Sequence, residues 1–261
     1  EGRAQGVVTA GNSGAALACG MFILGRINGV DRPALASIMP TLKKPIVLID
    51  VGANADCKPY NLVQFGLMAE VLARHVLGIA SPKVGILSIG EEEGKGNALT
   101  KEAYSLLKSS SLNFIGNVEG RDVFTGETDV IVCDGFVGNV ALKLSEGLGS
   151  ALTTMLKTEL KRSIWSKLGT LIALPAFKRF TKKIDYAEYG GAPILGLNGI
   201  AIVCHGSSNA RAITTALQQA ALFVRKKAND QIVQGLHANT ELSLFSRSGQ
   251  SSVMRREASG L

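Results

Sequence analysis

A single lysine stands among glycines in the segment GEEEGKGN, residues 90–97. Glycine lets a ligand approach the backbone closely, and an ammonium group stabilises a phosphate or a carbonyl oxygen that gains negative charge in a transition state. We therefore expect Lys95 to bind phosphate or to stabilise an oxyanion. The preceding Glu91, Glu92 and Glu93 are expected to fix the loop through backbone bonds or to repel unsuitable anions. A solvated loop lysine is the alternative interpretation of this pattern.

Four other segments combine glycine with Asn, Asp, Ser or His where a strand is expected to end: AGNSGA (10–15), DVGANADCKP (50–59), CDGFVGN (133–139) and CHGSSNAR (204–211). Asn139 could donate its amide to the oxygen that Lys95 contacts, or orient a bound anion. His205 and Ser207 precede a helix start, where backbone N–H groups favour phosphate. Asp56 and Asp134 could accept protons or orient their neighbours. The alternative is that these residues only cap helices and shape turns.

Several familiar catalytic motifs are absent from the sequence. GEEEGKGN is not a P-loop, because Gly96 stands where Ser or Thr is needed and Ile89 stands where the first glycine should fall. No G-x-G-x-x-G follows an expected strand, and G-x-S-x-G and H-E-x-x-H do not occur. The four cysteines are widely spaced, so we expect free thiols in a reducing cytoplasm, with a disulfide pair as the alternative. We expect no metal and no cofactor.

Alternating strands and helices are expected to position these loops. Strands are predicted for the β-branched runs at 6–10, 45–52, 83–90, 112–118, 129–135 and 199–206. Helices are predicted for 12–26, 60–77, 97–109, a long stretch from 137, and 207–229. This alternation is typical of a parallel sheet with helices on both faces, which binds ligands at the carboxyl ends of its strands. We therefore expect all five loops to meet at one edge of the sheet.

The net charge of +7 is concentrated in one segment. Eight cations and one acid lie between Lys157 and Lys183, whereas positive and negative residues balance in the rest of the chain. With its apolar residues and a bend expected at Pro175, this segment predicts a basic amphipathic helical hairpin suited to an anionic membrane surface. A core or dimer-interface helix pair is the alternative. The expected membrane contacts are Trp165, Leu168, Leu171, Ile172, Leu174, Phe177, Lys178 and Arg179.

Six segments carry a family resemblance: DVGANADCKP, SIGEEEGKGN, NFIGNVEGRD, VCDGFVGN, EYGGAPILGLNG and HGSSNARAI. In this order they closely resemble the PlsX family, the phosphate:acyl-acyl-carrier-protein acyltransferases of bacterial phospholipid synthesis, from about Gly6 to Leu236. The resemblance implies that phosphate attacks the thioester of a long-chain acyl-carrier protein and forms acyl-phosphate. It also implies a Rossmann-like three-layer αβα sandwich of the isocitrate dehydrogenase and phosphotransacetylase type, with the helical hairpin at 157–185 protruding from it.

By this resemblance, Lys95 and Asn139 match positions expected to be catalytic, Lys95 on phosphate or the oxyanion and Asn139 in an orienting role. We expect substrate or phosphate to be bound by Asn12, Ser13, Asn54, Asp56, Lys58, Gly94, Gly96, Asn97, Asp134, His205 and Ser207. The implied partners are acyl-acyl-carrier protein, inorganic phosphate, an anionic membrane, a second copy of the chain and a downstream glycerol-phosphate acyltransferase; nucleic acid is not expected. The implied location is the cytoplasm, at the inner face of the cell membrane.

Residues 1–235 are expected to form one catalytic α/β domain, and 236–261 a flexible tail. Members of the PlsX family carry an N-terminal segment that has no counterpart before Glu1, so part of the natural domain is expected to be missing. Two other functions fit parts of the sequence. A phosphotransacetylase acting on a short acyl-CoA would share the phosphate loops, and a non-catalytic membrane scaffold would share the basic segment. A dehydrogenase of the related fold is disfavoured because no nucleotide or metal motif is present.

Overall fold

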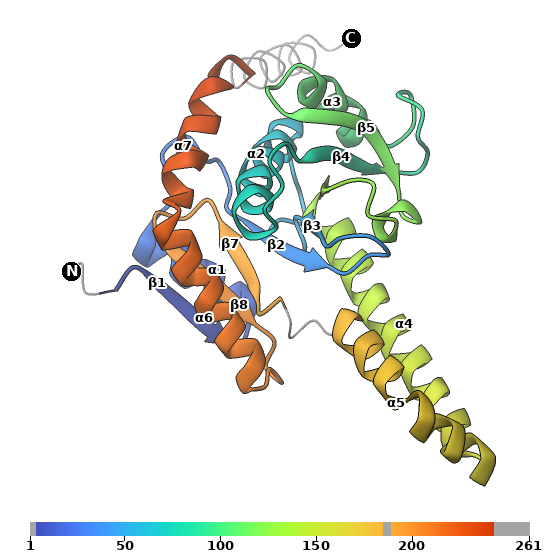
Figure 1. Cartoon of the computed structure of the whole chain (residues 1–261). Helices are drawn as coiled ribbons and strands as arrows, with labels where there is room; N and C mark the ends of the chain where they lie inside the picture. Colours follow the sequence, from blue (N-terminus) through green and yellow to red (C-terminus); the bar gives the residue numbers. More distant parts are fainter. Residues whose placement is uncertain (1–3, 185–188, 243–261) are drawn as a thin grey trace.

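The computed structural model describes residues 4–184 and 189–242, which form a sheet of eight strands with helices on both faces (Figure 1). In spatial order the strands are β1 (Gly6–Ala10), β8 (Ile200–Cys204), β7 (Ala192–Leu195), β2 (Ala34–Met39), β3 (Ile46–Ile49), β6 (Val130–Val132), β4 (Lys83–Ser88) and β5 (Asn113–Glu119). Successive residues of the central strands alternate between two buried clusters, one on each face. Val47 and Ile49 belong to one cluster and Ile46 and Leu48 to the other. The predicted three-layer arrangement is confirmed.

The expectation of a purely parallel sheet is wrong. β7 pairs antiparallel with both β8 and β2, and β2 pairs antiparallel with β3. As a result β1, β8 and β2 run in one direction, and the other five strands run in the opposite one. The carboxyl ends of β1 and β8 therefore face the opposite edge of the sheet from those of β3, β6 and β4. The five loops expected at one edge are divided into two groups.

The helices that cover one face are α2 (Pro59–Val76), α3 (Ala98–Lys108), α6 (Ala210–Arg225) and α7 (Ala228–Ala238). α2 is the central one, since thirteen of its residues are buried. On the other face lie α1 (Ser13–Cys19), the π-helical turn η1 (Gly20–Leu24) and the first turns of α4 (Gly135–Lys161). A short 3₁₀ turn, η2 (Asp122–Phe124), follows β5.

Two long helices, α4 and α5 (Ile164–Ile184), lie side by side and extend away from the sheet (Figure 1). The chain turns between them at residues 162–163, and Pro175 lies inside α5. The hairpin turn expected around Pro175 therefore lies at residues 162–163 instead, and α5 continues through Pro175, because the loss of one backbone hydrogen bond does not end a helix of 21 residues. The two helices are also longer than the hairpin expected at 157–185, because α4 already begins at Gly135. Residue 185 of the expected hairpin lies outside the described residues.

The C-terminal boundary of the packed structure lies beyond the expected one. α7 continues to Ala238, and Leu236 is buried in the core. Asn239 accepts a hydrogen bond from the Ser111 backbone N–H at 2.9 Å and donates one to the Ser111 hydroxyl, which ties this end to the start of β5. Residues 236–242 are thus not part of a tail, and residues 243–261 of the expected tail lie outside the described residues.

Candidate functional site

Three of the expected loops meet at one edge of the sheet. They follow β3, β6 and β4, which are neighbours in the sheet and run parallel. The first contains residues 50–58, the second leads into α4, and the third contains Lys95 and leads into α3. A strand-end location in an α/β sheet, next to the first turns of two helices, suits an anionic ligand.

Asp50 organises the first loop. Its carboxylate is fully buried and accepts hydrogen bonds from the backbone N–H groups of Gly52 at 3.1 Å, Ala53 at 3.0 Å and Asn54 at 2.7 Å, and from that of Leu35 on β2 at 3.1 Å. Burial raises the pKa of the Asp50 carboxyl above its ordinary value, and these hydrogen bonds act in the opposite direction. We did not expect this role from the sequence, although an aspartate between an apolar strand and a glycine was a visible signal.

Asn54 belongs to the scaffold of the site. Its side-chain amide donates to the Pro33 carbonyl and to the Asp50 carboxylate, both at 2.8 Å. The backbone carbonyl of Asn54 accepts a hydrogen bond from the Gly135 N–H at 2.7 Å. A Cβ on Gly135 would lie 2.6 Å from that carbonyl oxygen. The amide donors of Asn54 are therefore already engaged, so the structure favours a positioning role over the direct phosphate contact that we expected.

The first turn of α4 packs directly on this loop. Asp134 caps the helix by accepting from the Val137 N–H at 2.9 Å, and its own exposure is low. A Cβ on Gly138 would lie 1.9 Å from the Asp50 carbonyl oxygen, so only glycine fits there. The side chain of Asn139 is 3.5 Å from the position of a Cβ on Gly52, whose φ is +129°. Asn139 thus lies exposed beside the glycine turn, with its amide available to a ligand.

Backbone geometry shapes the loop that carries Lys95. The backbone N–H of Lys95 donates a hydrogen bond to the Glu92 carbonyl at 3.0 Å. The Lys95 side chain crosses Gly90, where a Cβ would lie 2.9 Å from Lys95 Cγ. Gly96 has a φ of +108°, and a Cβ there would lie 2.1 Å from the Thr100 hydroxyl. Asn97 caps α3 by accepting from the Thr100 N–H at 2.9 Å. The two glycines therefore serve to hold the lysine in place.

The acidic residues of this loop have other partners. Glu91 pairs with Arg121 at 3.4 Å, Glu93 pairs with Lys108 at 3.2 Å, and the Glu92 carbonyl accepts from the Asn117 amide at 2.6 Å. These exposed pairs add little stability, but they keep the Glu91 and Glu93 carboxylates occupied. The Glu92 carboxylate forms no ion pair with a described residue and lies 3.0 Å from the position of a Cβ on Gly90. Within the described part of the chain, no carboxylate pairs with Lys95. Its ammonium group is consequently available to an anion.

The hydroxyl of Ser88, at the end of β4, is not among the site residues expected from the sequence. Its oxygen is buried and forms no hydrogen bond with any described residue, and it would lie 3.0 Å from a Cβ on Gly96. Buried hydroxyl groups nearly always have a partner. Its position under the Lys95 loop adds a polar group to this edge of the sheet. A serine at a strand end is too common for sequence analysis to single it out.

The remaining residues expected in the site separate into two places. Asp56, Lys58 and Gly94 lie exposed on the loops just described. Asn12 and Ser13 follow β1, and His205 and Ser207 follow β8, so these four lie at the other edge of the sheet. There Asn12 caps α1, and His205 Nδ1 lies 2.6 Å from the Ser207 hydroxyl. The sheet directions therefore do not bring these residues to the Lys95 loop.

The thiol of Cys57, which lies on the Asp50 loop, is expected to react more slowly than the exposed thiol of Cys19. Cys57 is half-buried, and burial together with the nearby Asp50 charge raises the pKa of its thiol to about 12. Because the thiolate is the reactive form, iodoacetamide at pH 8 is expected to alkylate Cys57 about 100-fold more slowly than the exposed Cys19. Peptide mass spectrometry over a time course measures both rates. Similar rates in the folded protein would contradict this, and similar rates in urea serve as the control.

Among residues 4–184 and 189–242, no group of three or more His, Cys, Asp or Glu side chains is arranged to hold a metal ion. The exposed ammonium groups of Lys95 and Lys58, the exposed Asn139 amide and helix N-terminal N–H groups can bind an anion and stabilise an oxyanion.

Comparison with known proteins identifies relatives over nearly the whole chain. The family model described as "Fatty acid synthesis protein" matches residues 1–231. The phosphate acyltransferase of Nitratidesulfovibrio vulgaris strain DP4 is 64% identical over 248 residues, which are 95% of this chain and 72% of that protein. The phosphate acyltransferase of Lawsonia intracellularis is 62% identical over 250 residues, 95% of this chain and 72% of that protein.

Solved structures show the same fold at low sequence identity. A phosphotransacetylase from Streptococcus pyogenes superimposes with a TM-score of 0.58 at 19% identity, over 86% of this chain and 64% of that one. A branched-chain phosphotransacylase from Enterococcus faecalis V583 gives a TM-score of 0.53 at 17% identity, over 86% of this chain and 75% of that one. These likenesses agree with the fold type expected from the sequence.

Proposed function

Because the chain belongs to the fatty acid synthesis protein family and is a phosphate acyltransferase, we propose that its acyl donor is a long-chain acyl-acyl-carrier protein and that Lys95 and Asn139 carry the reaction. Acyl transfer to phosphate supplies acyl-phosphate for phospholipid synthesis. The proposal places the reaction at the edge formed by the loops after β3, β6 and β4. The other edge, with His205, is assigned no catalytic step.

The reaction needs alignment and charge stabilisation more than proton transfer. Near neutral pH a large share of inorganic phosphate is already dianionic, so one of its oxygens attacks the thioester carbonyl carbon without a strong base. A carbon–oxygen bond forms and the carbonyl oxygen becomes an oxyanion. When that oxyanion collapses, the carbon–sulfur bond breaks and the carrier thiolate leaves, taking a proton from solvent. Lys95 stabilises the phosphate or the oxyanion, and Asn139 orients the group that it contacts.

One observation carries this assignment. The Lys95 side chain packs over Gly90, and it has no carboxylate partner in the described part of the chain. By contrast, Glu91 forms an ion pair with Arg121, and Glu93 forms one with Lys108. The arrangement leaves the Lys95 ammonium group at the strand ends for an incoming anion. Asn139, on the first turn of the neighbouring helix α4, adds an uncharged donor at the same edge.

A donor comparison tests the proposal. The chain is incubated with phosphate and either palmitoyl-acyl-carrier protein or acetyl-CoA, and the free thiol released is measured. Phosphate-dependent release from the palmitoyl carrier alone is the expected result. Release confined to acetyl-CoA would instead support a phosphotransacetylase, and no release from either donor would favour a non-catalytic scaffold.

The pair α4 and α5 supports a membrane and dimer contact. Its apolar side chains lie largely in solvent: Trp165 is 79% and Ile172 83% exposed, and Leu144, Leu148 and Met155 of α4 are also exposed. Such a large uncovered apolar surface marks an interaction site. Among the described residues, no helix combines the length and apolar composition needed to cross a bilayer. We propose that α4 and α5 contact the inner face of the cell membrane and a second copy of the chain. Their cations would also attract an acidic carrier protein.

Charge reversal on α5 tests the membrane contact. Changing Lys178, Arg179 and Lys183 together to glutamate is expected to weaken binding to phosphatidylglycerol vesicles at least about 100-fold, since each basic residue near an anionic surface contributes about 1 kcal/mol. Vesicle co-sedimentation measures the binding. The control reverses three exposed cations elsewhere, Lys101, Lys226 and Lys227, and should leave binding nearly unchanged. Equal binding by the α5 variant and the parent would disprove the membrane contact.

A further inference from the structure

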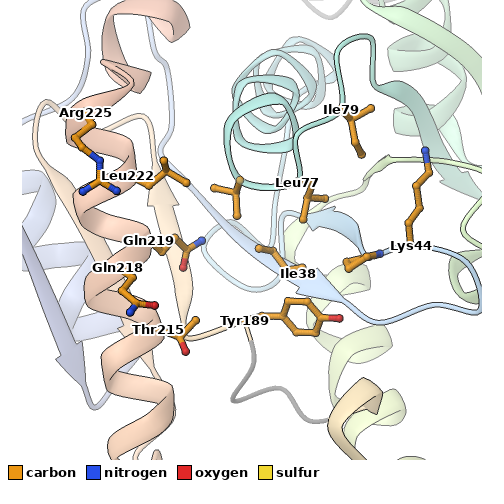
Figure 2. A pocket seen from close by; sticks show the side chains of 12 residues that line it. Ile38, Lys44, Leu77, Ile79, Tyr189, Thr215, Gln218, Gln219, Leu222 and Arg225 are labelled. Carbon is orange, nitrogen blue, oxygen red and sulfur yellow. The ribbon is translucent and has the colours of Figure 1, made fainter. Parts of the chain in front are cut away.

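A cavity of about 750 Å³ lies between α6, the end of α2 and the start of β3 (Figure 2). Lys44 and Pro45 line it and directly precede β3, whereas the Asp50 loop follows that strand. The cavity is therefore at the opposite end of β3 from the candidate site. Its walls are mainly apolar and include Ile38, Leu77 and Leu222. Nothing in the proposed reaction uses it.

One polar side chain is buried in this apolar surface. Gln219 of α6 is only 5% exposed, and neither its Oε1 nor its Nε2 has a hydrogen-bond partner among the described residues. Figure 2 shows the amide on the α6 wall of the cavity. Leaving an amide buried and unpaired costs about 1–3 kcal/mol, so native proteins rarely do it without a reason. A ligand that pairs with the amide must present an acceptor next to a donor.

Two cations lie on the lining of the same cavity. Lys44 forms an ion pair with Asp129 at 2.6 Å, while its side chain is still 48% exposed. Arg225, two turns along α6 from Gln219, forms no ion pair with a described residue. The cavity thus combines apolar walls, one unpaired amide and positive charge, which matches a flat heterocycle joined to an anionic group.

We propose that this cavity binds a purine nucleoside phosphate. The edge of a nucleobase presents an acceptor beside a donor, which a glutamine amide can pair with in a bidentate manner. Purines bury the most area against the apolar walls, and Arg225, on the same helix as Gln219, would contact the phosphates. A fatty acyl chain fits the walls but would leave the Gln219 amide unpaired. The site is separate from the acyl-transfer site and does not depend on it.

Isothermal titration calorimetry tests this site on the full chain in a buffer without inorganic phosphate, which would compete for Arg225. ATP and GTP are each expected to bind at one site. Gln219→Met keeps a similar shape without the amide and should weaken ATP binding at least about tenfold. The same change should raise the midpoint of thermal unfolding of the ligand-free protein, because it removes a buried unpaired group. Gln234→Met, on an exposed face of α7, is the control and should change neither quantity.

A second variant separates the phosphate contact from the base contact. Arg225→Gln is expected to weaken ATP binding about fivefold while leaving adenosine binding within about twofold, since only ATP has phosphates for the guanidinium to contact. The proposal is overturned if neither ATP nor GTP binds, if Gln219→Met binds ATP as tightly as the parent, or if palmitate binds to the cavity and the nucleotides do not.

Discussion

Replacing Lys95 by methionine is expected to lower the turnover of palmitoyl-acyl-carrier protein at least about 100-fold, because removing one preorganised group that stabilises an oxyanion typically costs a factor of 10² to 10³. Methionine keeps the length and packing of the chain over Gly90 and removes only the charge. The fold should be intact, since the Lys95 ammonium has no carboxylate partner in the described structure. Steady-state thiol release and the midpoint of thermal unfolding measure the two effects.

Two further variants make this result specific. Lys101→Met removes an exposed cation from α3, next to the same loop, and should leave turnover within about twofold. Lys95→Arg retains the charge in a different shape and should recover part of the activity. If Lys95→Met keeps most of the parental turnover, the lysine is a solvated loop residue and the proposed role is wrong.

Gly138→Ala is expected to have the largest effect on stability. The new Cβ would lie 1.9 Å from the Asp50 carbonyl oxygen and 2.8 Å from the Cys133 sulfur, so α4 must move away from the loop. Overpacking against backbone costs about 3 kcal/mol or more, which corresponds to a fall of about 6–12 °C in the unfolding midpoint for a domain of this size. Because Asn139 is the next residue, turnover should fall as well.

Gly147→Ala is the matched control, since it lies on the same helix and no heavy atom is within 4 Å of its Cβ position. Alanine has the higher helix propensity, so this variant should be more stable than the parent by about 0.5–1 kcal/mol. Differential scanning calorimetry compares the two substitutions. A Gly138→Ala protein that unfolds at the parental temperature would show that α4 does not pack on Asp50 as described.

The sequence predicted the individual strands and loops better than their directions. The runs that precede the Asp50 and Lys95 loops are β-branched and flanked by glycine, which is a local signal. β2 and β7 carry no such signal: ALASIM and APIL are short and lack alternation, and we assigned neither to a strand. Yet these two strands reverse the direction of the sheet and place His205 and Lys95 at opposite edges. Pairing between segments far apart in the chain is not encoded in either segment alone.

Local sequence also predicted only part of the candidate site. Lys95 and Asn139 could be proposed because their loops have unusual local composition. The engagement of the Asn54 amide depends on its contact with the Pro33 carbonyl about 20 residues earlier in the chain. The need for glycine at Gly138 depends on how α4 packs against the Asp50 loop, and no local pattern contains either contact. The unpaired amide of Gln219 is equally invisible in the sequence, since an amphipathic helix often carries glutamine at its border.

The most direct test of the central claim is thiol release in a single turnover, with and without phosphate. Enzyme in excess is mixed rapidly with palmitoyl-acyl-carrier protein, and free carrier thiol is followed over time. Direct attack by phosphate predicts no release until phosphate is added, and then full release with formation of acyl-phosphate. A burst of thiol without phosphate would instead reveal an acyl-enzyme intermediate, and would contradict a site in which Lys95 and Asn139 only align and stabilise.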